Sequence, residues 1–129
     1  MVRGMAGNAR IKIKVQIFCG EEIAMGPGKA DLMEAIAATG SISAAARDMG
    51  MSYRRAWLLV DAMNRCWTEP LVRTKPGGAA RSGAELSELG RTVLSDYRDL
   101  QEAVARTGSD SRWHGLETKI RPAPVPAKP

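Results

Sequence analysis

The sequence predicts a mainly α-helical domain with a small β-hairpin, and three observations predict it. Residues 41–64 have the pattern of a short helix, a glycine turn at Gly50 and a longer helix that begins with two arginines. Residues 71–86 can form two short strands around a glycine-containing tip, and residues 87–106 carry apolar side chains at helical spacing. This order of elements predicts a winged helix-turn-helix that ends in a long C-terminal helix.

The part of the chain before this motif is predicted to add one strand and one helix. Apolar and polar residues alternate from Ile11 to Phe18, which indicates a strand with one buried side. Glycines and a proline between Gly20 and Gly28 indicate a turn region. A helix should then run from about Gly28 to Thr39, and a glycine follows it as a stop signal.

The central motif contains two helices with serine caps. Ser43 is a suitable N-cap for a helix from Ala44 to Met49, and Ser52 is one for the longer helix that follows. Apolar residues recur along that longer helix at spacings of three and four, which predicts an inward stripe of Tyr53, Ala56, Val60, Met63 and Trp67.

The last predicted helix has an apolar stripe of its own. Ser87 can cap this helix, which should continue to about Arg106. Its apolar residues repeat close to a heptad, a pattern that often packs against a partner helix. We therefore expect a homodimer whose contact residues are Leu89, Val93, Tyr97, Leu100 and Val104.

The chain divides by composition into three parts. Residues 1–10 are rich in glycine, alanine and arginine, and we expect them to be disordered. Residues 11–106 are expected to form one domain. Residues 107–129 turn into a Gly/Ser/Asp segment and then a Pro-rich tail, a composition that cannot build a core, so this tail is also expected to be disordered.

The charge of the chain is positive and unevenly distributed. The formal net charge is +5 and the pI is about 9.6. Within residues 52–83, six basic side chains stand against two acidic ones, a balance of +4. A positive field on the longer helix of the motif and on the hairpin favours a polyanionic partner.

Several other classes of protein are excluded by what the sequence lacks. His114 is the single histidine, so no histidine-centred catalytic or metal site is expected, and no cofactor. Cys19 and Cys66 have apolar neighbours and are expected to be buried free thiols. The sequence GPGK ending at Lys29 lacks the first glycine and the Ser or Thr of a phosphate loop, so we interpret it as a helix start. No secretory signal or membrane span is visible, and we expect a cytoplasmic protein that is not an enzyme.

The start of the longer helix is the candidate reading surface. In a helix-turn-helix, side chains from the first turns of the second helix contact base edges in the major groove of DNA. If the apolar stripe faces inward, the outward set here is Arg54, Arg55, Trp57 and Leu58. Arg54 is the first choice for base reading because an arginine can donate two hydrogen bonds to one guanine.

A second set of side chains is predicted to hold the DNA backbone or the adjacent minor groove, and consists of Ser41, Ser43, Ser52, Tyr53, Arg73, Lys75 and Arg81. Two assignments stay open at this point. Tyr53 lies at the edge of the inward stripe and fits the core somewhat better than the DNA contact. Trp57 fits packing between helices and stacking on a sugar equally well.

Particular segments of the sequence resemble a known family. They are AATGSISAAA at 37–46, MGMSYRRAW at 49–57, and, downstream, Met63-Asn64, Pro70–Val72 and Leu86–Gly90. These segments resemble the N-terminal DNA-binding domain of the molybdate-responsive transcriptional regulator ModE, a winged helix related to LysR-type regulators. The resemblance covers about residues 11–106. It implies a DNA-binding regulator connected with molybdenum.

Two departures from the family pattern carry expectations of their own. Full-length members have a molybdate-binding region after the DNA-binding domain, whereas only residues 107–129 follow the last helix here. We therefore expect no molybdate-binding region and no small-molecule effector on this chain. The hairpin tip carries Ala79-Ala80-Arg81 where the resemblance implies a richer run of glycines.

The leading hypothesis is thus a sequence-specific transcriptional regulator that binds double-stranded DNA. One alternative is a winged-helix module that binds another protein through the pair Trp57-Leu58. The other is an architectural DNA binder without sequence preference. The operator, the regulated genes and the direction of regulation are not encoded in any pattern of the sequence.

Overall fold

The computed structural model describes residues 11–75 and 83–129, and residues Lys14–Gln101 form one compact unit within it. We call this unit the winged-helix unit. Its elements in chain order are β1 (Ile17–Cys19), β2 (Glu22–Met25), α1 (Pro27–Thr39), α2 (Ile42–Asp48), α3 (Tyr53–Cys66), β3 (Val72–Lys75), β4 (Gly83–Leu86) and the greater part of α4 (Glu88–Ala105).

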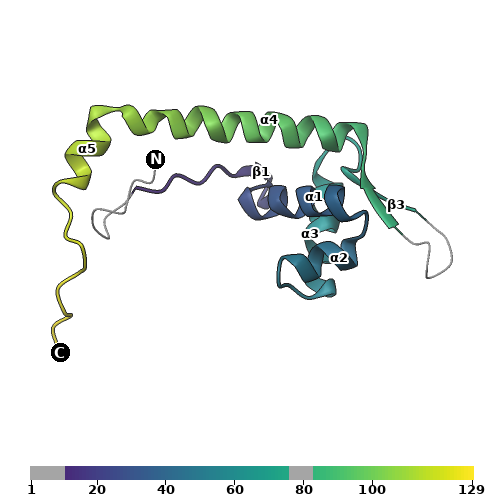
Figure 1. The fold of residues 1–129 in the computed structure, drawn as a ribbon, viewed down its shortest axis with the longest axis horizontal. Helices are drawn as coiled ribbons and strands as arrows, with labels where there is room; N and C mark the ends of the chain where they lie inside the picture. The colour runs from purple at the N-terminus through teal and green to yellow at the C-terminus, as the bar shows by residue number, and fades with distance from the viewer. Residues whose placement is uncertain (1–10, 76–82) are drawn as a thin grey trace. The chain divides into compact units, whose positions relative to one another are not determined.

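Two antiparallel hairpins flank a group of three helices in this unit (Figure 1). Strands β1 and β2 form one hairpin, and β3 and β4 form the other, with Val72 opposite Leu86 and Lys75 opposite Gly83. Helix α4 crosses α1 on the side away from α2 (Figure 1). The predicted fold class, mainly α with a small β-hairpin in a winged helix-turn-helix, is confirmed.

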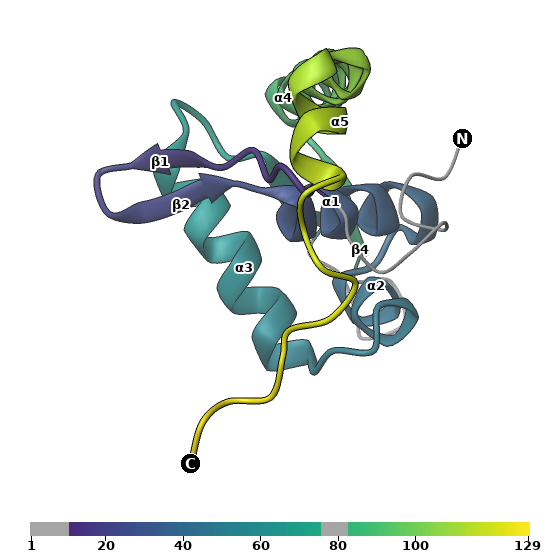
Figure 2. The same ribbon diagram turned by 90° about the vertical axis from the view of Figure 1, so that its left-hand side faces the viewer.

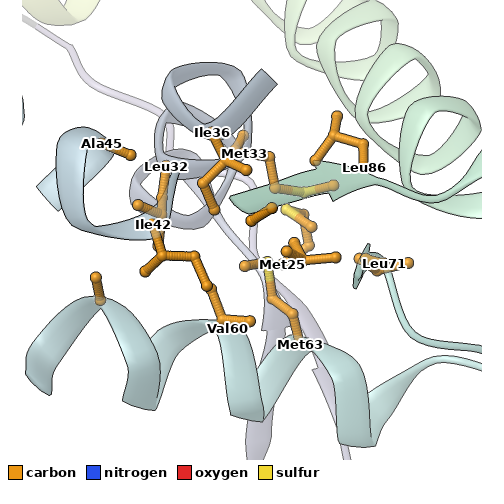
Figure 3. Packing of buried hydrophobic residues seen from close by; sticks show 14 of the residues in the cluster. Met25, Leu32, Met33, Ile36, Ile42, Ala45, Val60, Met63, Leu71 and Leu86 are labelled. Atoms are coloured by element: carbon orange, nitrogen blue, oxygen red, sulfur yellow. The ribbon is translucent and has the colours of Figure 1, made fainter. Parts of the chain in front are cut away.

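The core is built where α1, α2 and α3 meet the inner residues of the two hairpins (Figure 3). Ala56, Val60 and Met63 are completely buried, which confirms the central part of the inward stripe predicted for α3. The largest side chains enclosed with them are Met25, Leu32, Met33, Ile36, Leu71 and Tyr97. Apolar burial of this kind is the main stabilising contribution to folding.

Helix α4 is attached to the rest of the unit by hydrogen bonds as well as by packing. The hydroxyl of Tyr97 donates to the carbonyl oxygen of Val15 at 2.7 Å. The guanidinium of Arg98 bonds the carboxylates of Asp31 and Glu34 at 2.7 and 2.6 Å. Because Arg98 donates hydrogen bonds to two carboxylates of α1, the pKa of its guanidinium is raised well above its usual range.

This attachment changes the prediction for the dimer stripe. Val93 and Tyr97 are buried against the core of their own unit, and Leu89 packs partly against it. Leu100, by contrast, is 44% exposed. The heptad-like repeat thus includes residues that cover the chain's own core, whereas Leu100 stays on the surface.

The N-terminal hairpin differs from the sequence prediction. The predicted strand Ile11–Phe18 is wrong over most of its length, because regular pairing begins only at Ile17. The predicted turn region contains a strand of its own, β2, whose partner is β1. The alternation correctly predicted that Val15 and Ile17 face the core, but it does not specify a pairing partner. Ile13, which was predicted on the same face, is half-exposed.

Helix α2 begins two residues earlier than predicted. Its N-cap is Ser41, whose hydroxyl accepts a hydrogen bond from the amide of Ala44 at 3.1 Å. Ser43, the predicted cap, lies inside the helix and accepts a hydrogen bond from Arg47 at 3.0 Å. Serine is a preferred N-cap residue, so both positions are suitable by residue type. The helix starts at the earlier position, where Ile42, its first residue, is buried in the core.

The second unit comprises the described residues 11–13 and 102–129. It contains the last turn of α4, a short 3₁₀ helix at Arg106–Ser109 and helix α5 at Ser111–Glu117. Asp110 caps α5 and pairs with Arg112, which holds the pKa of the carboxyl well below its usual range. The division of the chain into domains and disordered ends stays a prediction, although α5 lies within the segment for which the sequence predicts no regular structure. Over the described residues, none of the helices has the length and apolar character to cross a bilayer.

Candidate nucleic-acid interface

The first turns of α3 present basic and apolar side chains to the surface. Ser52 is the N-cap, as predicted, and its hydroxyl accepts a hydrogen bond from the amide of Arg55 at 3.0 Å. Arg54 and Arg55 are exposed, and Leu58, one turn further along, is 58% exposed. The amphipathic pattern of α3 therefore places the predicted reading residues on its outer face.

The two arginines that are predicted to read bases differ from the third arginine of α3 in their partners. No ion pair or hydrogen bond joins the side chain of Arg54 or Arg55 to another residue of the described part of the chain. Arg65, by contrast, bonds Asp61 at 2.9 Å and Glu22 at 3.3 Å. The N–H donors of Arg54 and Arg55 are therefore available to an external acceptor. Arg65 instead neutralises the acidic Asp61 on the same outer surface.

Three elements enclose a small pocket beside this surface. It has a volume of about 140 Å³ and lies between α2, α3 and the β3–β4 hairpin. Five predicted site residues line it, namely Ser41, Ser43, Tyr53, Trp57 and Lys75. The pocket therefore combines hydroxyl groups, an ammonium group and aromatic edges, which are groups that contact DNA phosphates and sugars.

Tyr53 lies on the surface and not in the core. Its side chain is 53% exposed, which overturns the sequence-based preference for a core position. The ring meets Trp57 edge-on, with the centroids 6.2 Å apart and the planes at 82°. Trp57 itself is half-buried and packs partly against the core. It therefore lies between the core and Tyr53, and it also lines the pocket.

The hairpin contributes cations of two kinds. Lys75 forms an ion pair with Glu85 on the neighbouring strand at 3.1 Å, with both side chains more than half exposed. Arg73 is exposed and lies opposite Glu85 in the strand register. Arg81, the predicted tip contact, lies outside the described residues. Thr74 also lines the pocket and is a contact candidate that the sequence analysis missed.

Lys29 is a further cation that the sequence analysis did not assign to the site. It lies in the first turn of α1 and is half-buried. Burial lowers the pKa of its ammonium group, the carboxylate of Glu22 opposes that shift, and the positive charge of Arg55 adds to it. Lys29 is thus a partly buried cation on α1 whose charge is influenced by Glu22 more than by Arg55.

Asn64 fixes the β3–β4 hairpin to α3, a role that the sequence analysis also missed. Its side-chain oxygen accepts hydrogen bonds from the amides of Leu71 and Val72 at 2.9 and 3.1 Å. Its side-chain nitrogen donates to the carbonyl oxygen of Val72 at 3.0 Å. One amide side chain near the end of α3 therefore determines where β3 begins.

Replacing Asn64 by alanine is expected to destabilise the unit by about 2 kcal/mol, because three backbone groups of buried residues lose their partner. Asn64→Asp is the matched control. It keeps an acceptor for the two amides, but it loses the donor to Val72 and places a carboxylate oxygen beside that carbonyl oxygen. Any stability that it retains above Asn64→Ala therefore comes from the two amide bonds. Urea unfolding followed by circular dichroism measures both, and equal stability of Asn64→Ala and the wild type would contradict this role.

Comparison with known proteins places these features in a family context. No family model matches the chain. The chain is 44% identical over 82 residues to the molybdenum-pterin-binding protein MopB of Rhodobacter capsulatus, a match that covers 64% of this chain and 30% of that protein. It is 41% identical over 70 residues to the molybdenum transport protein ModE of Azotobacter vinelandii, covering 54% of this chain and 26% of that protein.

A third relative is named as a regulator. The chain is 34% identical over 84 residues to the DNA-binding transcriptional dual regulator ModE of Escherichia coli K12, covering 65% of this chain and 32% of that protein. This chain therefore spans less than a third of the length of each of these relatives.

Comparison with solved structures also supports the winged-helix fold. The DNA-binding domain of CbnR, solved in complex with DNA, superposes with a TM-score of 0.51 at 25% identity, and the match covers 66% of this chain and 92% of that one. Full-length CbnR with its target DNA gives a TM-score of 0.50 over 66% of this chain and 28% of that one. Through its winged-helix unit, this chain is a homologue of the molybdenum-related ModE, MopA and MopB proteins and has the fold of the DNA-binding domains of LysR-type regulators.

Proposed function

We propose that this chain is a cytoplasmic, sequence-specific DNA-binding transcriptional regulator, without catalytic activity, that places α3 in the major groove. The observation that carries the proposal is the outer face of α3, where Arg54 and Arg55 have no ion-pair or hydrogen-bond partner in the described structure and Leu58 is exposed. Its kinship with regulators and its likeness to a domain solved on DNA support the same conclusion.

In this proposal the residues of α3 divide into readers of different base edges. Arg54 donates two hydrogen bonds to a guanine, and Arg55 contacts a second base or a phosphate. Leu58 and the exposed edge of Trp57 offer apolar surface, which suits the methyl group of a thymine or a sugar.

The pocket between α2, α3 and the hairpin is proposed to receive a backbone phosphate. Ser41 and Ser43 supply hydroxyl groups from one side, and Lys75 supplies an ammonium group from the other. The pair between Lys75 and Glu85 is exposed and thus weak, so a phosphate can displace the carboxylate. Tyr53 also lines this pocket, and Ser52, Arg73 and Arg81 complete the predicted phosphate set.

Selection of binding sites from a random DNA pool tests the proposal directly. A sequence-specific regulator should enrich a single motif after a few rounds, and the bound fraction should fall steeply as salt rises. Binding to the starting pool as tight as to the selected sequences would identify an architectural DNA binder. Failure to be retained by duplex DNA or heparin at low salt would favour the protein-interaction module, in which Trp57 and Leu58 contact another protein.

We also propose that the regulator acts as a homodimer through the C-terminal part of α4. Leu100 is 44% exposed on that helix, and Val104 follows it by one turn. Two recognition helices in a dimer should reach successive turns of the major groove, about 34–36 Å apart.

Sedimentation equilibrium of the full chain measures the dimer, and Leu100→Glu should shift the equilibrium towards the monomer. Leu116→Glu is a control, because Leu116 is also exposed but lies on α5. A wild-type protein that sediments as a monomer at micromolar concentration, with and without DNA, would refute the dimer.

A further inference from the structure

The two cysteines of the chain lie at neighbouring ends of two elements. Cys19 is the last residue of β1, and Cys66 is the last residue of α3. In the strand register Cys19 lies opposite Glu22, whose carboxylate bonds Arg65, the residue before Cys66, at 3.3 Å. Figure 2 shows the β1–β2 hairpin against the C-terminal end of α3. Residues far apart in sequence are thus brought together here.

The hairpin is held in this position independently of the cysteines. The indole N–H of Trp67, directly after Cys66, donates to the carbonyl oxygen of Ala24 in β2 at 3.0 Å. Together with the pair between Arg65 and Glu22, this bond fixes the end of α3 on the hairpin from both sides of Cys66. The folded chain therefore holds the two thiols close together before any bond forms between them.

The two thiols differ in their surroundings, and neither is buried as predicted. Cys19 is exposed, and Cys66 is half-exposed. Burial raises the pKa of Cys66, and its interaction with the thiol of Cys19 raises it further. Cys19 is thus the thiol that an oxidant in solution reaches first, and Cys66 is a neighbour that can react with the product.

We propose that Cys19 and Cys66 form an oxidation site that closes into an intramolecular disulfide when the protein meets a peroxide. The thiol of Cys19 takes one oxygen from the peroxide and becomes a sulfenic acid, and the other oxygen leaves as water. The sulfur of Cys66 then attacks that sulfur as its thiol loses its proton. The S–S bond forms, the S–O bond breaks, and the departing hydroxide takes up a proton and leaves as a second water. Two thiols are oxidised, and one hydrogen peroxide is reduced to two waters.

The disulfide would enclose α1, α2 and nearly all of α3 in one covalent loop. It would join the N-terminal hairpin to the last residue of α3, at the opposite end of the helix from Arg54 and Arg55. A crosslink between residues already adjacent in the folded state stabilises that state by restricting the unfolded chain. By thermodynamic linkage, the factor by which the disulfide stabilises the folded state equals the factor by which folding favours formation of the disulfide.

Glutathione redox buffers measure this factor on the full chain. The ratio of oxidised to reduced protein, read by mass spectrometry after acid quench, gives the effective concentration of one thiol at the other. We expect this concentration to be about 30-fold or more higher in native buffer than in concentrated urea. A separate reaction with hydrogen peroxide should give a monomer lighter by two hydrogen masses, with Cys19 and Cys66 in one crosslinked tryptic peptide.

Cys19→Ser is the matched control, because Cys19 is exposed and its replacement leaves the core intact. In this variant glutathione should remain attached to Cys66 as a mixed disulfide, since no second thiol is present to displace it. Equal effective concentrations in native buffer and urea would overturn the proposal. A disulfide-linked dimer as the main product of peroxide treatment would overturn it as well.

Discussion

Replacing Gly90 by alanine should destabilise the winged-helix unit by about 3 kcal/mol, near the upper end for overpacking a tightly packed site. Gly90 is buried in the first turn of α4, where the helix touches the segment that leads into β3. A Cβ atom at this position would overlap the carbonyl oxygen of Leu71 and lie 3.0 Å from its carbonyl carbon. The obstacle is backbone, so no rotation of a side chain can relieve it.

The backbone of Leu71 also has little freedom to move away. Its carbonyl oxygen accepts a hydrogen bond from the amide of Ser87 at 2.9 Å, and its own amide donates to Asn64 at 2.9 Å. The hydroxyl of Ser87 adds two more bonds, as acceptor from the amide of Gly90 and as donor to the carbonyl oxygen of Pro70. Moving Leu71 would therefore disturb α3, β3 and α4 at once.

Urea unfolding followed by circular dichroism measures the effect, with Gly28→Ala as the control. Gly28 is also helical, but a Cβ atom there meets nothing within 4 Å. That variant should be neutral or gain up to about 1 kcal/mol from the better helix propensity of alanine. A Gly90→Ala protein with the wild-type unfolding midpoint would show that the contact with Leu71 is not a tight one.

The close contact at Gly90 also illustrates what sequence patterns leave out. Periodicity identified α1, α3, the β3–β4 hairpin and α4, because each of these elements carries its own apolar spacing or turn residues. A helical glycine, however, has no local pattern that distinguishes a tight contact, as at Gly90, from open space, as at Gly28. The difference depends on which backbone segment returns to the helix, and only the tertiary structure contains that information.

The same limit explains the errors at the hairpins and in the dimer stripe. The strand β2 is four residues long and has no alternation of its own, so only its pairing with β1 defines it. The repeat along α4 predicted an apolar face correctly, but periodicity does not distinguish the chain's own core from a partner. The contacts of Tyr97 with the N-terminal segment decide that question.

In the candidate interface, local sequence patterns could identify the exposed charged residues. The residues that hold the interface in place depend on long-range contacts. Arg54 and Arg55 could be predicted because they follow a serine cap and precede a regular inward stripe. The role of Asn64 could not be predicted, since its partners Leu71 and Val72 lie at the start of the hairpin and become its neighbours only when the chain folds back. The position of Tyr53 stayed open between core and surface because the edge of a stripe is ambiguous by spacing alone.

Replacing Arg54 by alanine should weaken binding to the selected DNA site by about 10- to 100-fold, the loss expected when one bidentate contact to a guanine is removed. Binding to random duplex should change much less, because non-specific affinity comes from phosphate contacts. The side chain is exposed and has no partner in the described structure, so its removal should leave the stability of the fold unchanged.

Arg73→Ala is the comparison that separates base reading from general electrostatics. Arg73 is an exposed arginine of similar freedom, but it lies on the hairpin and not on α3. Its loss should weaken the selected site and random duplex by the same factor and reduce the slope of log K against log salt by about 0.9. Fluorescence anisotropy titrations of both duplexes at two salt concentrations give all of these quantities. If Arg54→Ala lowered both affinities equally, as expected for Arg73→Ala, Arg54 would be a phosphate contact, and base reading would have to rest on Arg55 and Leu58.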